Sequence, residues 1–161
     1  MWSSVAEIGL AHVMAGRPGF RDEVVAKYVA MAERGATASG TDLWAILDTV
    51  AAVRRQTSRL FAQWDAVLMP ACAAMPWAAD VPFPAEIDGQ PVGPRGHAIY
   101  TGWVNAAGHP AISIPAPVEG MPIGAQIVAD LGGEGLLLDL ADAYGAKTPL
   151  FPRWPAMAET A

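Results

Sequence analysis

The chain has 161 residues, which is enough for one domain with a hydrophobic core. Hydrophobic residues make up 53% of it, charged residues only 16%, and the net charge is −6. This balance argues against direct binding to nucleic acid or to an acidic membrane, because both require a basic surface. Composition leaves two interpretations open: a well-packed globule, or a piece of a larger protein whose apolar faces meet neighbours outside these residues.

Cys72 is the only cysteine, which excludes an intrachain disulfide and a paired-cysteine metal site. This usage is typical of a reducing compartment, so we expect a cytoplasmic protein. No basic region precedes an apolar run at the N-terminus, and we expect no signal peptide. No phosphate-binding loop, dinucleotide fingerprint or metal-ligand spacing is found, so we expect no cofactor and no metal.

Residues 1–64 are predicted to be helical. A short apolar helix is expected over 5–14. A second is expected over 20–34, with Gly35 as its C-cap and an apolar face at helical spacing made of Val24, Val25, Tyr28 and Met31.

A third, long helix is expected to begin at 39–41, where Ser39 can cap the free N–H groups and Asp42 suits the positive end. Its apolar stripe consists of Leu43, Ile46, Leu47, Val50, Val53, Leu60, Phe61 and Trp64. Arg54 and Arg55 lie on the opposite face, which we interpret as solvated.

Residues 65–129 are predicted to be rich in strands and loops. A short buried strand over 65–70 ends at a proline. Ten of the fourteen prolines lie between Pro70 and Pro122, which indicates loops laid over a core. Further strands are expected over 111–114 and 123–129, followed by a closing helix over 134–146 and an irregular tail from Thr148. The uncharged segment 96–118 is as long as a membrane helix, but its prolines and glycines indicate a buried, turn-rich segment instead.

Two linked segments carry the strongest signal in the chain. Residues 105–115 read NAAGHPAISIP, and residues 120–126 read GMPIGAQ. With the preceding helix and the DAVLMP strand, this order resembles the C-terminal region of the amidase-signature family, serine-dependent amide hydrolases. The matching positions are Thr101, Asn105, Gly108, Pro110, Ala111, Ser113, Pro115, Gly120, Pro122, Gly124 and Gln126. The resemblance covers roughly residues 20–146.

Most of these motif residues have a structural explanation. Gly108 suits a positive φ before His109 and Pro110, and Gly124 suits close packing within a strand. Gln126 is expected to bond backbone groups if it is buried. Contact with substrate is the alternative, and the resemblance implies a pocket wall formed by Thr101, Trp103, Asn105 and the loop around Cys72.

In the resembled family, catalysis uses a serine activated through a second serine and a lysine, with a glycine-rich loop for the oxyanion. A weak hydroxyl nucleophile requires such a base and such donors. The serines here are Ser3, Ser4, Ser39, Ser58 and Ser113, and the lysines are Lys27 and Lys147. None lies in a segment of the family's catalytic type. A triad of Ser113 with His97 or His109 is conceivable but lacks an exposed nucleophile turn. We therefore expect no catalytic residue in this chain.

The predicted fold is α/β: the C-terminal part of the amidase-signature fold, with a few strands of a mixed sheet packed by helices, forming a single partial domain over 1–161. The predicted function is completion of the fold and pocket of an enzyme that hydrolyses carboxamide C–N bonds, with the isolated chain inactive. The alternative is a non-catalytic remnant or interaction module. The expected partner is an N-terminal amidase part or a second copy. The substrate stays open among aliphatic, aryl and fatty amides and glutamine.

Overall fold

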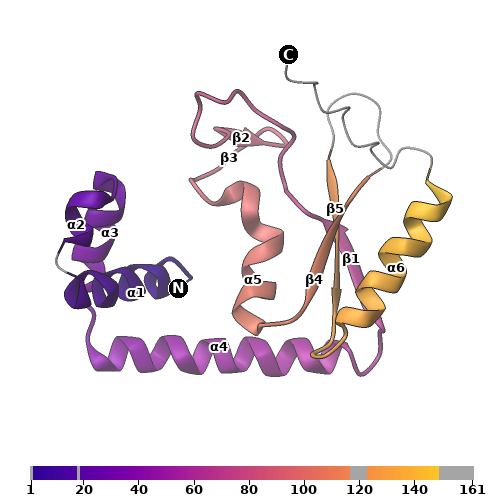
Figure 1. Cartoon of the computed structure of the whole chain (residues 1–161), viewed down its shortest axis with the longest axis horizontal. Coiled ribbons are helices and arrows are strands. Elements are labelled where there is room, and N and C mark those ends of the chain that lie inside the picture. The colour runs from indigo at the N-terminus through magenta and orange to yellow at the C-terminus, as the bar shows by residue number, and fades with distance from the viewer. Residues whose placement is uncertain (1, 18, 117–122, 149–161) are drawn as a thin grey trace, which may run out of the picture. The chain divides into compact units, whose positions relative to one another are not determined.

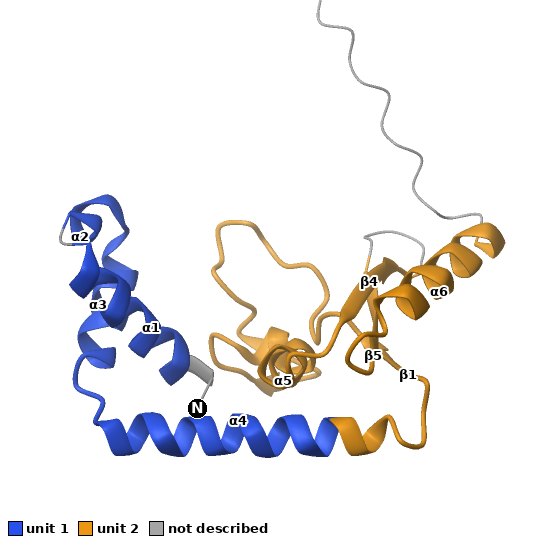
Figure 2. Cartoon of the chain, turned by 60° about the horizontal axis from the view of Figure 1, so that its bottom comes forward, with its two compact units in different colours: residues 1–57 blue, residues 58–161 orange. Residues whose placement is uncertain are grey.

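The computed structural model describes residues 2–17, 19–116 and 123–148. The chain divides into two compact units, residues 1–57 and 58–161 (Figure 2). The first is entirely helical where it is described, and the second combines helices with two small sheets (Figure 1). The α/β class expected from the sequence is confirmed. The single partial domain over 1–161 stays a prediction.

In the first unit, α1 (Trp2–Gly16) packs against α3 (Ala26–Gly35). The helix predicted over 20–34 is broken: α2 (Phe20–Glu23) ends at Val24, whose backbone is extended, and α3 begins two residues later. Of the predicted packing face, Val24 and Met31 are half-buried, but Val25 is 64% exposed and Tyr28 44%. Small residues form the buried face instead, because Ala32 and Gly35 let α1 come close.

Gly35 is the last residue of α3, not a left-handed cap, and the predicted capping role is corrected. A Cβ atom at this position would lie 2.0 Å from the backbone oxygen of Glu7 and 2.6 Å from the backbone nitrogen of Ile8. Since backbone atoms cannot rotate aside, only glycine permits this crossing of α1 and α3.

The long helix α4 (Gly40–Leu60) begins as predicted, because Ser39 and Asp42 form a reciprocal cap. The Asp42 backbone N–H donates to Ser39 Oγ at 3.1 Å, and the Ser39 N–H donates to Asp42 Oδ2 at 2.9 Å. The helix ends at Leu60, so the expected extension to Trp64 is wrong: a turn follows at 61–63. Much of its apolar stripe is open, with Leu47 50% exposed.

The second unit contains a three-stranded antiparallel sheet in the order β1 (Ala66–Pro70), β5 (Gly124–Ala129), β4 (Ala111–Pro115). These three strands were predicted nearly to the residue. The helix α6 (Glu134–Lys147), also predicted, packs Leu137 against Ile114, Ile127 and Ala129 to form the core. Figure 1 shows α6 lying along one face of this sheet.

Two elements of the second unit were missed. The helix α5 (Ile99–Ala107) follows a 3₁₀ turn, η1 (Gly96–Ala98), and ends at Gly108, whose φ of +72° is the positive value predicted for it. A small hairpin pairs β2 (Glu86–Ile87) with β3 (Gln90–Pro91). Both lie in the region interpreted as loops, although no proline lies between Pro94 and Pro110, where α5 forms. Within the described ranges, no helix has the length and hydropathy needed to cross a bilayer.

The outer edge of β1 is open, since among the described strands β1 pairs only with β5. The Ala71 N–H donates to Gly124 O at 2.9 Å, and in antiparallel strands hydrogen-bonded pairs alternate with pairs that are not hydrogen-bonded. The backbone groups of Ala66 and Leu68 therefore point toward the open edge, and the Leu68 side chain is 69% exposed.

Candidate active-site wall

A hollow of about 310 Å³ lies in the second unit, where β1 ends and β5 begins. Its lining consists of Pro70, Cys72, Ala73, Ala74, Met75, Pro76, Trp77, Ile123 and Gly124. Hydrogen bonds position the loop after β1: the Ala71 N–H donates to Gly124 O, and the Ala73 N–H donates to His97 O, both at 2.9 Å. The hollow is thus built on a sheet end and not on a free loop.

The two polar side chains in the lining already have partners. Cys72 Sγ donates to His97 O over 3.3 Å, and Trp77 Nε1 donates to Val81 O at 2.8 Å. The Trp77 ring also tilts against the His97 ring, with centroids 5.1 Å apart. Both side chains therefore present carbon and sulfur surface to the hollow.

Gly124 and Ser113 meet on neighbouring strands beside this hollow. A Cβ atom at Gly124 would lie 2.8 Å from Ser113 Oγ and 3.1 Å from Ala71 Cβ. The close packing predicted for Gly124 is confirmed.

Of the four predicted wall residues, the structure brings only Cys72 to the hollow. Thr101, Trp103 and Asn105 lie on α5, where Thr101 Oγ1 donates to Ala98 O at 3.2 Å and Asn105 is exposed. Asn105 lies in the last turn of this helix. The substrate contacts of all four residues stay a prediction. Met75 and Trp77 belong to the loop around Cys72 that the sequence named as a whole, whereas Ile123 was not expected at the wall.

A serine–histidine assembly does not form among the described residues. Ser113 makes no hydrogen bond with a histidine there. The His109 side chain is buried, stacks on Phe61 with centroids 5.4 Å apart, and its Nε2 lies 3.3 Å from Asp130 Oδ1. His97 Nδ1 is buried without a partner. In the described part, no group of three His, Cys, Asp or Glu side chains could hold a metal ion.

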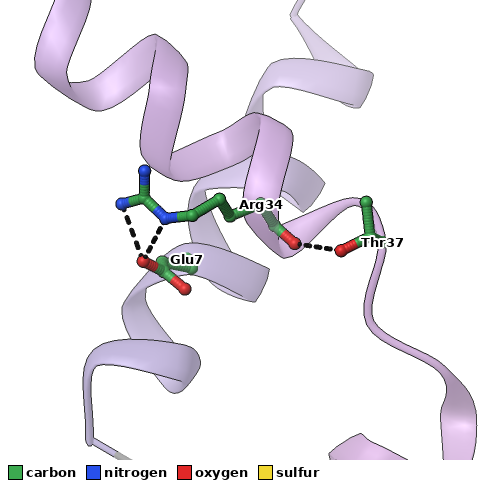
Figure 3. Close-up of polar contacts among 3 residues, drawn as sticks. All are labelled: Glu7, Arg34 and Thr37. Carbon is green, nitrogen blue, oxygen red and sulfur yellow. Dashed lines mark hydrogen bonds and ion pairs between the residues drawn. The ribbon is translucent and has the colours of Figure 1, made fainter.

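A second, more polar hollow of about 380 Å³ lies in the first unit beside the crossing of α1 and α3. Figure 3 shows its charged side chains: Arg34 Nε and Nη2 both approach Glu7 Oε1, at 2.9 and 2.8 Å, and Thr37 Oγ1 donates to Arg34 O at 2.8 Å. The ion pair joins the two helices. Asp42 also lines this hollow. The hydrogen bond that it accepts from the Ser39 hydroxyl lowers the pKa of Asp42 below its ordinary value of 3.8, and the bond from the Ser39 backbone N–H lowers it further.

The amidase family model matches residues 13–138. Since the match covers more than half of the chain, the chain belongs to the amidase family, the amidase-signature enzymes expected from its motifs. The curated relatives include a putative amidase, AmiC, of Mycobacterium bovis, 39% identical over 93 residues that make up 55% of this chain and 19% of the relative. A second is a glutamyl-tRNA(Gln) amidotransferase subunit from Pseudomonas aeruginosa, 35% identical over 60% of this chain and 19% of the relative.

Solved structures share the fold. A 6-aminohexanoate cyclic dimer hydrolase matches with a TM-score of 0.78 and 26% identity, over 94% of this chain and 35% of its own. An amidase matches with a TM-score of 0.80 and 21% identity, over 91% of this chain and 34% of its own. The chain therefore spans about a fifth of the curated relatives and about a third of the solved structures that it matches.

Proposed function

We propose that this chain is the C-terminal portion of an enzyme that hydrolyses carboxamide C–N bonds, completing the fold and one wall of the substrate pocket. The observation that carries the proposal is the family match over residues 13–138, with a hollow built on the matched strands. In this proposal the serine and lysine machinery lies in a preceding part of the amidase fold.

The positions of the serines support a separate catalytic part. Ser39 caps α4, and Ser113 lies within β4 against Gly124. The Ser39 hydroxyl donates to Asp42 Oδ2 at 2.7 Å as part of the helix cap, and neither serine is hydrogen-bonded to a histidine or lysine, the bases that most often activate a serine nucleophile, among the described residues. The reaction class is acyl transfer: a serine of the complete enzyme attacks the amide carbonyl, the amine or ammonia leaves, and water releases the acid. This chain contributes positioning and exclusion of water.

The open edge of β1 supports a need for a partner. Unpaired strand edges and exposed apolar residues favour association. We propose the N-terminal amidase part as that partner, with self-association as the alternative, and the cytoplasm as the location because of the single cysteine.

A second candidate function is a non-catalytic interaction module. The observation that favours it is the exposed apolar surface, including Trp44 at 68% and Leu138 at 60%. Such a module would associate through these surfaces and would hydrolyse no amide in any complex.

The test is purification of the tagged chain from its source, followed by native mass spectrometry and an assay of ammonia release from carboxamides. A stoichiometric partner with an amidase N-terminal sequence, together with ammonia release, is the expected result. A lone chain or a homo-oligomer favours the interaction module. A partner that binds stoichiometrically while the complex releases no ammonia contradicts the proposed hydrolysis.

A further inference from the structure

The hollow at the end of β1 has a mostly apolar lining. Among the described residues that line it, none carries a charged side chain. Met75, Trp77 and Ile123 supply the large apolar surfaces, and Met75 is 63% exposed. Pockets for small ligands are built in this way, from apolar walls with few polar groups.

The polar groups of the lining side chains are already engaged. Cys72 Sγ donates to His97 O, and Trp77 Nε1 donates to Val81 O. A ligand that enters the hollow therefore gains contacts with carbon and sulfur but finds no side-chain ion to pair with. A charged ligand group would find only backbone polar groups there, with no opposite charge to offset the hydration that it loses.

We propose that this hollow receives the apolar body of an uncharged alkyl or aryl carboxamide, and that it discriminates against glutamine. Free glutamine carries an ammonium and a carboxylate next to its Cα, and both require charged or hydrogen-bonding partners. This inference rests on the proposed function, which supplies the amide group of the ligand. It adds the substrate class.

Cys72 provides a site-specific probe, because it is the only cysteine, it is exposed, and it lines the hollow. The small neutral reagent methyl methanethiosulfonate is allowed to react with the chain, and the modified fraction is followed by intact mass. Benzamide and L-glutamine are compared at about 50 mM, above the roughly 1–10 mM Kd expected of a small ligand in an open hollow.

We expect benzamide to slow the modification of Cys72 by roughly fivefold or more and glutamine by less than about 1.5-fold. In an amide series, hexanamide should protect several-fold better than acetamide, because each added methylene buries more apolar surface. Equal protection by benzamide and glutamine, equal protection by acetamide and hexanamide, or no protection by any ligand would overturn the inference.

A pair of matched variants locates the protection. Met75→Asn changes the lining without adding a charge that could alter the reactivity of Cys72. Leu138→Asn makes the same kind of change on α6, at a side chain that is 60% exposed and outside the lining. We expect protection by benzamide to fall at least threefold in the first variant only. Protection that persists unchanged in Met75→Asn overturns the assignment to this hollow.

This assay measures occupancy without hydrolysis. Protection by benzamide in a chain whose isolated complex releases no ammonia would contradict the proposed function and leave the ligand class standing. Ammonia release from benzamide by that complex, without protection of Cys72, would contradict only the inference about the hollow.

Discussion

Nε2 of His109 lies 3.3 Å from Oδ1 of Asp130, and this contact joins the start of β4 to the turn between β5 and α6. The His109 side chain is fully buried, whereas that of Asp130 is 54% exposed. The contact has an ion-pair distance but not the alignment of a hydrogen bond, since both ring nitrogens of His109 lack a hydrogen-bond partner. Packing of the ring on Phe61 is therefore its main stabilising interaction.

We expect His109→Phe to change the free energy of unfolding by less than about 1 kcal/mol, because an apolar ring keeps the packing and removes two unpaired nitrogens. His109→Ala should lower it by roughly 2–4 kcal/mol, because the lost ring leaves a cavity. Asp130→Asn should cost less than about 1 kcal/mol, since its carboxylate is half exposed. Urea unfolding followed by circular dichroism measures all three. A Phe variant as unstable as the Ala variant would show that the ion contact dominates.

The crossing of α1 and α3 depends on one glycine. We expect Gly35→Ala to lower the free energy of unfolding of the first unit by roughly 1–3 kcal/mol or more, because its Cβ would overlap the Glu7 carbonyl. Gly9→Ala is the matched control in α1, where a Cβ would meet nothing within 4 Å. The control should raise stability by about 0.5–1 kcal/mol through helix propensity. Equal effects of the two substitutions on the urea midpoint would contradict the close crossing.

The cap of α4 makes stability depend on pH at the acidic end. Since the pKa of Asp42 is lowered in the fold, its contribution is fully present above the unfolded value of 3.8 and is lost as pH falls through the lowered pKa. Ser39→Ala removes the hydroxyl and should raise the pKa of Asp42 toward 3.8, as measured by NMR titration of its carboxyl group. Thr49→Ala, which loses only a bond to Ala45 O, should leave that pKa unchanged.

Gln126 lies in the middle of β5 and is 6% exposed, and its Nε2 donates to Tyr100 O at 3.2 Å. This bond links the sheet to α5 and confirms the expected contact with backbone. Gln126→Met should lower the free energy of unfolding by about 1–2 kcal/mol, because the buried carbonyl loses its donor. Gln56→Met on the exposed face of α4 should change it by less than about 0.5 kcal/mol. Thermal unfolding of both variants provides the comparison.

Ser113 has no catalytic role in the proposed function. Ser113→Ala should therefore leave ammonia release by the assembled enzyme within about twofold, because the residue is a small strand side chain next to Gly124. The assay uses the complex purified from its source with a carboxamide substrate. Loss of activity by more than about a hundredfold, the scale of a missing nucleophile, would assign catalysis to this chain.

The three strands, α4 and α6 were predictable because their apolar patterns and their proline, glycine and cap residues act locally. Helix α5 was not, since its apolar segment, which contains no proline, was interpreted together with the proline-containing motif that follows it. The break before α3 was also missed: Val24 and Val25 fit the apolar spacing of a helix, but both are β-branched, which favours the extended backbone found there.

Of the four predicted wall residues, only Cys72 lies at the hollow, and its role there stays a prediction. The other lining residues come from segments about fifty residues apart, at 72–77 and 123–124. Which loop residues meet across such a separation depends on the strand register, which a single sequence does not specify.

The sequence by itself determined the family, the order of the main elements and the positive φ at Gly108, because motif spacing and backbone sterics are local properties. Tertiary structure decided which surfaces are buried: the small-residue crossing at Gly35, the stacked His109 and the apolar hollow beside Cys72. Each of these arises where segments distant in the sequence come within contact distance, and contact free energies depend on that geometry and not on residue type alone.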